Sequence, residues 1–213
     1  MKQQKIGFPS GNVNLDGIIT TPEGNTDNIP GVVICHPHPI FGGNMESLVV
    51  KQISSVLAEN GITSLRFNFR EFPNNDGDFG KTGDQVYDLK SAFNTLGDWP
   101  NVNNKKIALA GVSFGSSVIL KALPELKNVA GVFLACPTAN ALRNSQIAGF
   151  NKPKIVLSGD KDLIAPSELL YEVSKTIPSL EFKVLHGANH AWESFETKLG
   201  QEAYGFFTNI FSR

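Results

Sequence analysis

The sequence predicts a single α/β domain, built on a mostly parallel, doubly wound sheet of about eight strands. Two observations lead to this fold class. Short apolar runs rich in β-branched residues alternate with longer segments of helical periodicity along nearly the whole chain. The 213 residues also fall within the usual size of one compact core, and no linker-like stretch divides residues 1–213.

The predicted elements alternate in an ordered way, and most strands end before a turn or loop sequence. The first two strands, joined at residues 10–12, are expected to form an antiparallel hairpin at one edge of the sheet. The predicted strands cover residues 5–8, 15–20, 32–35, 63–69, 106–110, 129–135, 155–158 and 182–185. The predicted helices cover residues 45–60, 84–96, 113–126, 167–176 and 191–211.

The most informative stretch is I-A-L-A-G-V-S-F-G at residues 107–115, where an apolar strand leads into G-x-S-x-G and then into a helix. A serine nucleophile must project its Oγ from a sharp turn between strand and helix, where larger neighbouring side chains would clash. Gly111 and Gly115 provide that clearance. The turn directs the first N–H groups of the helix to the space beside Ser113, so the N–H of Phe114 is the first expected oxyanion donor.

A serine nucleophile needs a base, and the base needs an acid that orients it; on such a sheet they follow in the order Ser, Asp, His. Asp160 and Asp162 follow the strand at residues 155–158, and His186 and His190 follow the last strand. The acids come just past the carboxyl end of a strand, the edge where open α/β sheets place their ligands. Chain order alone leaves one acid and one base to be chosen from these two pairs.

The second oxyanion donor is expected in the loop after the third strand, within G-V-V-I-C-H-P-H-P-I-F-G-G-N at residues 31–44. Pro37 and Pro39 have no backbone N–H, which leaves His38 as the expected donor, with Ile40 as the next candidate. A zinc site at His36 and His38 is the alternative, because imidazole pairs often bind this metal. Their spacing lacks a third clustered ligand, so side chains that hold the loop by stacking or hydrogen bonding are the preferred interpretation.

Nearly the whole chain resembles the α/β-hydrolase superfamily, in particular a small bacterial branch without a lid that is related to dienelactone hydrolases and short-chain carboxylesterases. The motifs that carry the resemblance are H-P-H-P-I-F-G-G at residues 36–43, L-R-F-N-F-R at 65–70 and G-V-S-F-G at 111–115, together with the loops at Asp162 and His190. The resemblance implies the α/β-hydrolase fold and an esterase-like activity.

The resemblance also chooses between the candidate acids and bases. G-x-x-D-x-x-x-P at residues 159–166 resembles the acid loop of the family, which implies that Asp162 is the acid. G-A-N-H resembles its histidine loop, which implies that His190 is the base. Asp160 is then interpreted as a turn residue that caps its own backbone, and His186 as a structural histidine bonded to backbone.

The chain departs from this branch at two places. R-E-F-P-N-N at residues 70–75 stands where the branch has a glycine-rich turn, so the loop beside the pocket is expected to differ in shape. Dienelactone hydrolase uses a cysteine nucleophile, whereas this chain has Ser113. The resemblance therefore does not imply that this chain is specific for lactones.

Lipases of the superfamily commonly insert their lid between the sixth and seventh strands. Residues 136–152 leave no room there for a substantial cap, so an open site is expected. Four aromatic residues fall on loops that would surround such a site, and packing in the core is the alternative for each. These pocket candidates are Phe41, Phe72, Phe79 and Trp192.

Together these features predict a serine hydrolase, most similar to carboxylesterases, that cleaves a small ester and requires no metal or organic cofactor. His190 takes the proton of Ser113 while Asp162 fixes the ring, and the N–H groups of Phe114 and His38 hold the oxyanion. The same residues would serve a thioesterase, peptidase or acyltransferase. A non-catalytic binding protein of the same fold is the alternative from another class.

A net charge of −1 and a pI near 6.4 provide no basic field for nucleic acid or an anionic membrane, so a small-molecule ester or thioester is the expected partner. The start M-K-Q-Q-K-I-G-F-P-S lacks the apolar segment of a signal peptide, and no run approaches membrane-spanning length. We therefore expect a soluble cytoplasmic protein. Cys35 and Cys136 end apolar runs and are expected to be buried and reduced, with a disulfide between them as the alternative.

Overall fold

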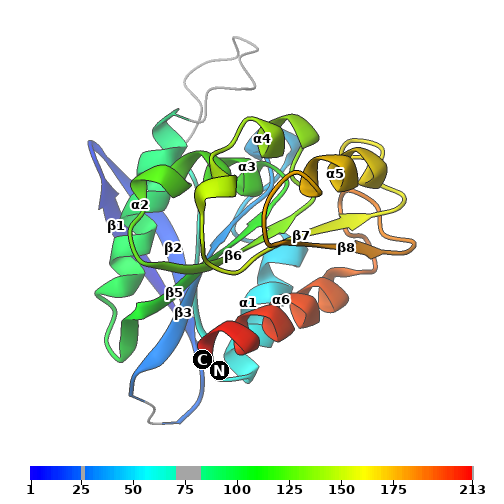
Figure 1. Cartoon of the computed structure of the whole chain (residues 1–213). Coiled ribbons are helices and arrows are strands. Elements are labelled where there is room, and N and C mark those ends of the chain that lie inside the picture. Colours follow the sequence, from blue (N-terminus) through cyan, green and yellow to red (C-terminus); the bar gives the residue numbers. More distant parts are fainter. Residues whose placement is uncertain (25–26, 71–82, 213) are drawn as a thin grey trace.

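The computed structural model describes residues 1–24, 27–70 and 83–212, and it confirms the predicted fold class (Figure 1). One eight-stranded sheet has the order β1-β2-β4-β3-β5-β6-β7-β8. The strands are β1 (Lys2–Ser10), β2 (Val13–Thr21), β3 (Ile29–Cys35), β4 (Thr63–Phe67), β5 (Val102–Val112), β6 (Val129–Ala135), β7 (Lys154–Gly159) and β8 (Leu180–Leu185).

The antiparallel part of the sheet lies at the edge where the sequence predicts it. β1 and β2 form a hairpin that turns at Gly11, whose φ of 60° suits a residue without a Cβ. β2 also pairs antiparallel with β4, and every neighbouring pair from β4 through β8 is parallel. The carboxyl ends of the parallel strands therefore meet at one edge of the sheet, where ligand sites of such sheets lie.

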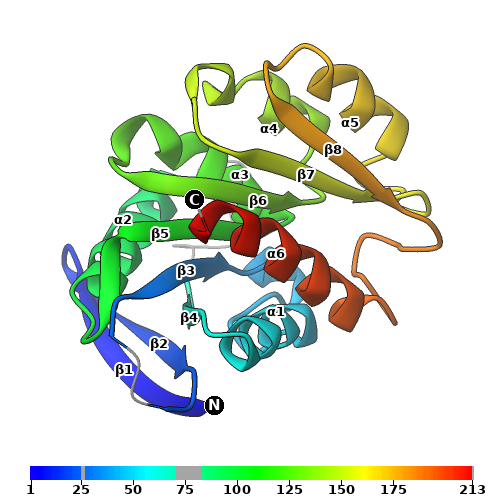
Figure 2. The same cartoon turned by 60° about the horizontal axis from the view of Figure 1, so that its bottom comes forward.

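Helices cover both faces of this sheet (Figures 1 and 2). α1 (Leu48–Glu59) and α6 (Glu196–Phe211) pack against each other on one face. The other face carries α2 (Gly83–Gly97), α3 (Phe114–Ala122), α4 (Ala139–Arg143) and α5 (Ser167–Ser174). Because both faces are covered, central strands are apolar without alternation, as in β3, where Val32, Val33 and Ile34 are all fully buried.

Two helix boundaries differ from the sequence prediction for identifiable reasons. The last helix begins at Glu196 rather than at residue 191, because Trp192 and Ser194 have positive φ angles of 62° and 64° that no α-helix accommodates. The helix after Ser113 ends at Ala122 and continues as a 3₁₀ turn, Leu123–Glu125, which contains Pro124.

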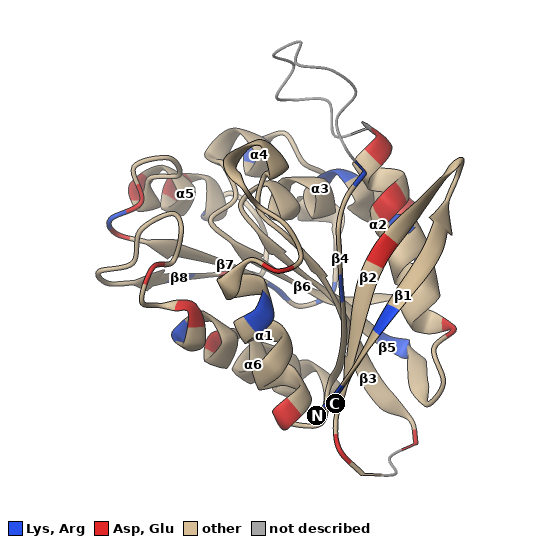
Figure 3. Ribbon diagram, turned by 180° about the vertical axis from the view of Figure 1, so that it is seen from behind, with Lys and Arg blue, Asp and Glu red and all other residues tan. Residues whose placement is uncertain are grey.

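The segment between β6 and β7 holds no lid in the described structure. It contains only the five-residue helix α4, which the sequence analysis did not predict, and a 3₁₀ turn at Ile147–Gly149. None of the helices in the described ranges is both long enough and apolar enough to cross a membrane. Basic and acidic residues are interspersed over the elements seen from behind (Figure 3).

Candidate active site

Ser113 lies on the sharp turn between β5 and α3 that the motif predicts. Its φ of 53° is positive, an uncommon and strained conformation for a residue with a side chain. The two glycines of the motif are required by close approach. A Cβ on Gly115 would lie 2.2 Å from the carbonyl oxygen of Cys35, and one on Gly111 would lie 2.6 Å from the nitrogen of Ser116. The turn is therefore packed directly against the end of β3.

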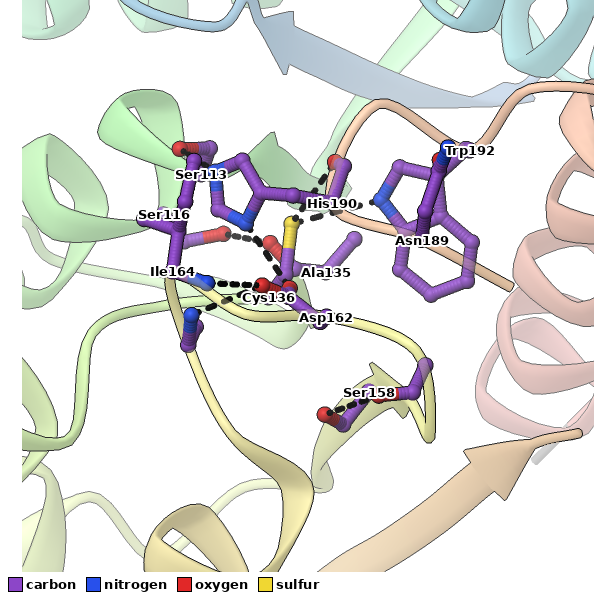
Figure 4. A network of polar contacts seen from close by, with 12 residues as sticks. Ser113, Ser116, Ala135, Cys136, Ser158, Asp162, Ile164, Asn189, His190 and Trp192 are labelled. Atoms are coloured by element: carbon purple, nitrogen blue, oxygen red, sulfur yellow. Dashed lines mark hydrogen bonds and ion pairs between the residues drawn. The ribbon is translucent and has the colours of Figure 1, made fainter. Parts of the chain in front are cut away.

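Ser113, His190 and Asp162 form one hydrogen-bonded chain (Figure 4). Ser113 Oγ lies 2.8 Å from His190 Nε2, and His190 Nδ1 lies 2.7 Å from Asp162 Oδ2. The other oxygen of Asp162 accepts the backbone N–H groups of Ile164 at 2.9 Å and Ala165 at 2.7 Å. The carboxylate is thus fixed by its own loop and turns only one oxygen to the imidazole.

The surroundings of His190 favour its protonated form. Burial of the ring lowers the pKa of His190, but the contacts with Asp162 and Cys136 outweigh this and raise the pKa well above its usual value of 6.5. Asp162 is 3% exposed, so its interaction with the imidazolium is shielded from water. The arrangement can therefore accept a proton from Ser113 and hold it on the ring.

The two candidates not favoured by the resemblance contact each other instead of Ser113. Asp160 Oδ2 lies 3.0 Å from His186 Nδ1, and Asp160 Oδ1 accepts the N–H of Gly187 at 2.6 Å. These contacts lower the pKa of Asp160, and the hydrogen bond from the Gly187 N–H has the largest effect, followed by the one with His186. Asp160 therefore accepts a hydrogen bond from the backbone of the loop after β8, and not from its own turn as predicted. His186 contacts the Asp160 side chain, and not a backbone group as predicted. Its side chain is 87% exposed.

The loop after β3 is held by its histidines. His36 Nδ1 contacts the carbonyl oxygen of Pro37 at 2.6 Å, and His36 Nε2 accepts the N–H of Phe69 at 3.1 Å. Both ring nitrogens are therefore occupied, and burial lowers the pKa of His36 to about 4. His38 Nδ1 accepts the N–H of Ile40 at 3.2 Å. These contacts agree with the prediction that the side chains shape the loop.

The two residues predicted to supply oxyanion donors are neighbours. The rings of His38 and Phe114 lie 4.5 Å apart between centroids, because the end of β3 packs against the start of α3. In the described residues, His36 and His38 belong to no group of three potential metal ligands. The one such group is Cys136, Asp162 and His190, in which the acid and the imidazole are already bonded to each other.

A cavity of about 1130 Å³ opens beside Ser113 and His190. Phe41 lines it, as the sequence analysis proposed, while Phe72 and Phe79 lie outside the described residues. One wall comes from the segment around α4, which the sequence analysis did not assign to the pocket. Its cavity residues are Thr138, Asn140, Ala141, Asn144, Ser145 and Gln146.

Residues 32–207 match a family described as "Alpha/beta hydrolase domain". The chain belongs to this family. A solved alpha-beta serine hydrolase homologue from Coxiella burnetii is 28% identical, with a TM-score of 0.79 and coverage of 96% of this chain and 97% of that one.

Two further solved structures show the same fold. A serine hydrolase without lid from Xanthomonas campestris is 23% identical, with a TM-score of 0.81 over 98% of this chain and 95% of that one. A dienelactone hydrolase from Anabaena variabilis is 20% identical, with a TM-score of 0.79 over 98% of each chain. The resemblance of this chain to alpha/beta hydrolases is therefore confirmed, and the described segment between β6 and β7 holds no lid.

Trp192 does not line the cavity of this hydrolase, so its assignment as a pocket residue is wrong. It is fully buried, and its Nε1–H contacts the Sγ of Cys136 at 3.3 Å (Figure 4). Cys136 Sγ in turn contacts the backbone oxygen of His190 at 3.7 Å. The thiol, at the end of β6, therefore bridges two points of the histidine loop. Cys35 and Cys136 are both free thiols, so the alternative of a disulfide between them is not realised.

The L-R-F-N-F-R motif fixes the loops around the site, a role that the sequence analysis did not assign. Arg66 donates to the backbone oxygen of Met45 at 2.8 Å, and Asn68 accepts the N–H of Met45 at 2.9 Å. Arg70 forms a 2.7 Å ion pair with the fully buried Asp88 of α2. The sequence carried a signal for this role, since polar residues alternate with apolar ones in the motif and a buried polar side chain needs a hydrogen-bonding partner.

Proposed function

We propose that this protein is a serine hydrolase that cleaves a small carboxylic ester through an acyl-enzyme on Ser113. The observation that carries the proposal is the hydrogen-bonded chain from Ser113 through His190 to Asp162. A hydroxyl is a weak nucleophile unless a positioned base removes its proton during attack, and this chain supplies both the base and the acid that orients it.

The proposed reaction proceeds in two steps. Ser113 Oγ attacks the ester carbonyl while His190 Nε2 takes its proton, and the imidazolium then gives that proton to the leaving alcohol. Water activated by the same ring cleaves the acyl-enzyme and releases the acid and free Ser113. The N–H groups of Phe114 and His38 are proposed to hold the charge on the carbonyl oxygen. Neither step needs a metal or an organic cofactor.

The cavity supports a small-molecule substrate. It opens directly beside the nucleophile, and no lid covers it in the described part of the chain. The name of the Coxiella burnetii structure, a serine hydrolase homologue, agrees with this reaction class. We further propose that the protein is cytoplasmic, where its buried Cys35 and Cys136 would stay reduced, and that it binds no nucleic acid.

Labelling with a fluorophosphonate tests the proposal without any choice of substrate. One adduct is expected on Ser113 of the wild type, and none on Ser113→Ala. Ser117→Ala is the matched control, because Ser117 lines the same cavity on the helix that follows Ser113 and should leave the adduct in place. Absence of an adduct on folded wild-type protein would refute the proposal and favour a non-catalytic binding protein.

A panel of matched esters, thioesters and amides then separates the esterase from its alternatives. Ester turnover that depends on Ser113 supports an esterase, whereas a clear preference for thioesters or amides would assign the same residues to a thioesterase or peptidase. Product formation with added alcohol or amine acceptors, in place of hydrolysis, would identify an acyltransferase. All of these rates should disappear in Ser113→Ala.

A further inference from the structure

The cavity beside Ser113 extends along α3. Beyond Phe114, the helix contributes Ser117, Leu120 and Lys121 to the cavity, and Pro124 follows in the next turn. These residues recur at intervals of three and four, so they form one stripe on the helix surface. Since an α-helix rises about 1.5 Å per residue, the stripe carries the cavity roughly 12 Å from Ser113 to Lys121.

Apart from His190, the cavity is lined in the described structure by one cationic and one anionic side chain, which come from helices on opposite faces of the sheet. Among the described residues that line it, Lys121 is the one lysine or arginine and Glu196 is the one carboxylate. Lys121 lies near the end of α3, whereas Glu196 begins α6 on the other face of the sheet (Figure 2). The cavity is therefore positive at the far end of the α3 stripe and negative where α6 begins.

Lys121 differs from several other lysines of this chain. Lys90, Lys175 and Lys183 each form an ion pair with a glutamate. Within the described ranges, no salt bridge involves Lys121. A cation that faces a cavity and is not neutralised by a neighbour favours an anionic ligand group.

The surfaces between Ser113 and Lys121 are apolar or neutral. Phe114 and Leu120 on α3 face the segment of α4, which contributes Ala141 and the amide side chains of Asn140 and Asn144. Asn144 Nδ2 donates to Asn140 Oδ1 at 2.9 Å, so these two amides already satisfy part of each other's hydrogen bonding. An apolar chain would fit this stretch, and a second charge there would find no opposite partner.

We propose that the substrates are esters that carry a carboxylate, separated from the scissile carbonyl by an apolar chain, and that Lys121 binds this carboxylate. The inference rests on the proposed function, because it takes Ser113 as the point of attack. An extended chain covers about 1.2 Å per bond, so a span of roughly 12 Å corresponds to about ten bonds. Glu196 repels a substrate bound in the reverse direction.

The test compares p-nitrophenyl esters whose acyl chains end either in a carboxylate or in a methyl group, at lengths of about four, eight and twelve carbons. A second series carries the same end groups on the alcohol side. Wild-type kcat/KM should favour the carboxylate over the methyl ester by about 3- to 10-fold in one series, at the length that reaches Lys121. Added salt should reduce that ratio.

Charge variants identify the residue that is responsible. Lys121→Met should bring the ratio of carboxylate to methyl ester close to one, and Lys121→Glu should invert it. Lys127→Met is the matched control, because Lys127 is an exposed lysine just beyond the same helix that does not line the cavity, and it should leave the ratio unchanged. A wild-type ratio at or below one in both series, or an unchanged ratio in Lys121→Met, would overturn the inference.

A direct binding measurement tests the role of Lys121 independently of whether the protein hydrolyses esters. Calorimetric titration of Ser113→Ala with the carboxylate esters measures recognition without turnover. Tighter binding of the carboxylate ester than of its methyl partner, lost when Lys121→Met is added, supports the inference even if no ester is hydrolysed. Equal binding of the two esters contradicts it, even if Ser113 is labelled and neutral esters are cleaved.

Discussion

Gly115→Ala is the substitution that probes the packing of the nucleophile turn most directly. A Cβ at this position would lie 2.2 Å from the backbone oxygen of Cys35 and 2.8 Å from its Cβ. Side-chain carbons do not approach backbone oxygens closer than about 3.0 Å, so β3 and α3 must separate by about 0.8 Å. The atoms in the way are the backbone carbonyl group of Cys35 and its Cβ, which is fixed by the backbone, so no flexible side chain can give way.

The separation should cost both stability and activity. Overpacking of this kind costs about 1 to 3 kcal/mol of unfolding free energy. The proposed oxyanion donors are the N–H groups of Phe114, the first residue of α3, and of His38, in the loop after β3. The separation would displace one donor from the other, and a displacement of about 1 Å can cost on the order of 100-fold in rate. We therefore expect kcat/KM to fall by about 100-fold while the protein still folds.

The measurements are urea unfolding, kcat/KM on a p-nitrophenyl ester and the rate of fluorophosphonate labelling. Gly205→Ala is the control, because Gly205 is exposed on α6 and a Cβ there meets nothing within 4 Å. It should raise stability by up to about 1 kcal/mol and leave kcat/KM unchanged. Wild-type kcat/KM in a folded Gly115→Ala protein would refute the packing argument.

Four further predictions follow from the site. Asp162→Asn should lower kcat by several orders of magnitude, because the imidazole loses its orienting acid, whereas Asp160→Asn should leave kcat nearly unchanged; steady-state kinetics of both variants would expose a wrong choice of acid. Since the pKa of His190 is raised and only the neutral ring accepts a proton, kcat/KM should rise with pH through the range above 6.5; a profile flat from pH 5 upward would contradict this. Burial lowers the pKa of His36 from 6.5 to about 4, so as the pH falls the imidazole is protonated in the unfolded chain before it is protonated in the folded protein. About 3 kcal/mol of unfolding free energy should therefore be lost between pH 6.5 and pH 4. Urea unfolding of His36→Gln should show a smaller loss over the same pH range. Cys136→Ala should lower kcat about tenfold with little change in KM, because the histidine loop loses its bridge to the end of β6. Cys136→Ser should restore most of the lost kcat, and equal kcat values in the two variants would argue against a positioning role.

Much of the fold was predictable because its signals are local. Each predicted strand overlaps an observed one. Central strands, which are buried on both faces, consist of consecutive apolar residues, whereas an edge strand such as β8 alternates between more and less exposed residues. The G-x-S-x-G turn was predictable for the same reason. Its strained residue and its two glycines lie within five positions of the chain, and their steric requirement does not depend on distant partners.

Other features depended on contacts between distant segments. Trp192 was taken for a pocket residue because its loop follows His190, but the positive φ of the loop turns the indole into the core, against a thiol 56 positions away. The wall from α4 was missed because a five-residue helix has no periodic pattern to recognise. The role of Arg66 and Asn68 was missed because their partner, Met45, precedes them by more than twenty residues.

The sequence by itself determined the order of the elements, the nucleophile turn and the short set of candidate acids and bases, because these follow from local sterics and hydrophobic patterning. Only the tertiary structure decided which acid contacts which histidine. Asp160 and Asp162 are two positions apart on one loop, yet they bond His186 and His190 respectively. That pairing is set by how the loops after β7 and β8 fold over the sheet edge. The same edge brings Ser113 from β5 to within a hydrogen bond of His190, 77 positions away in the chain.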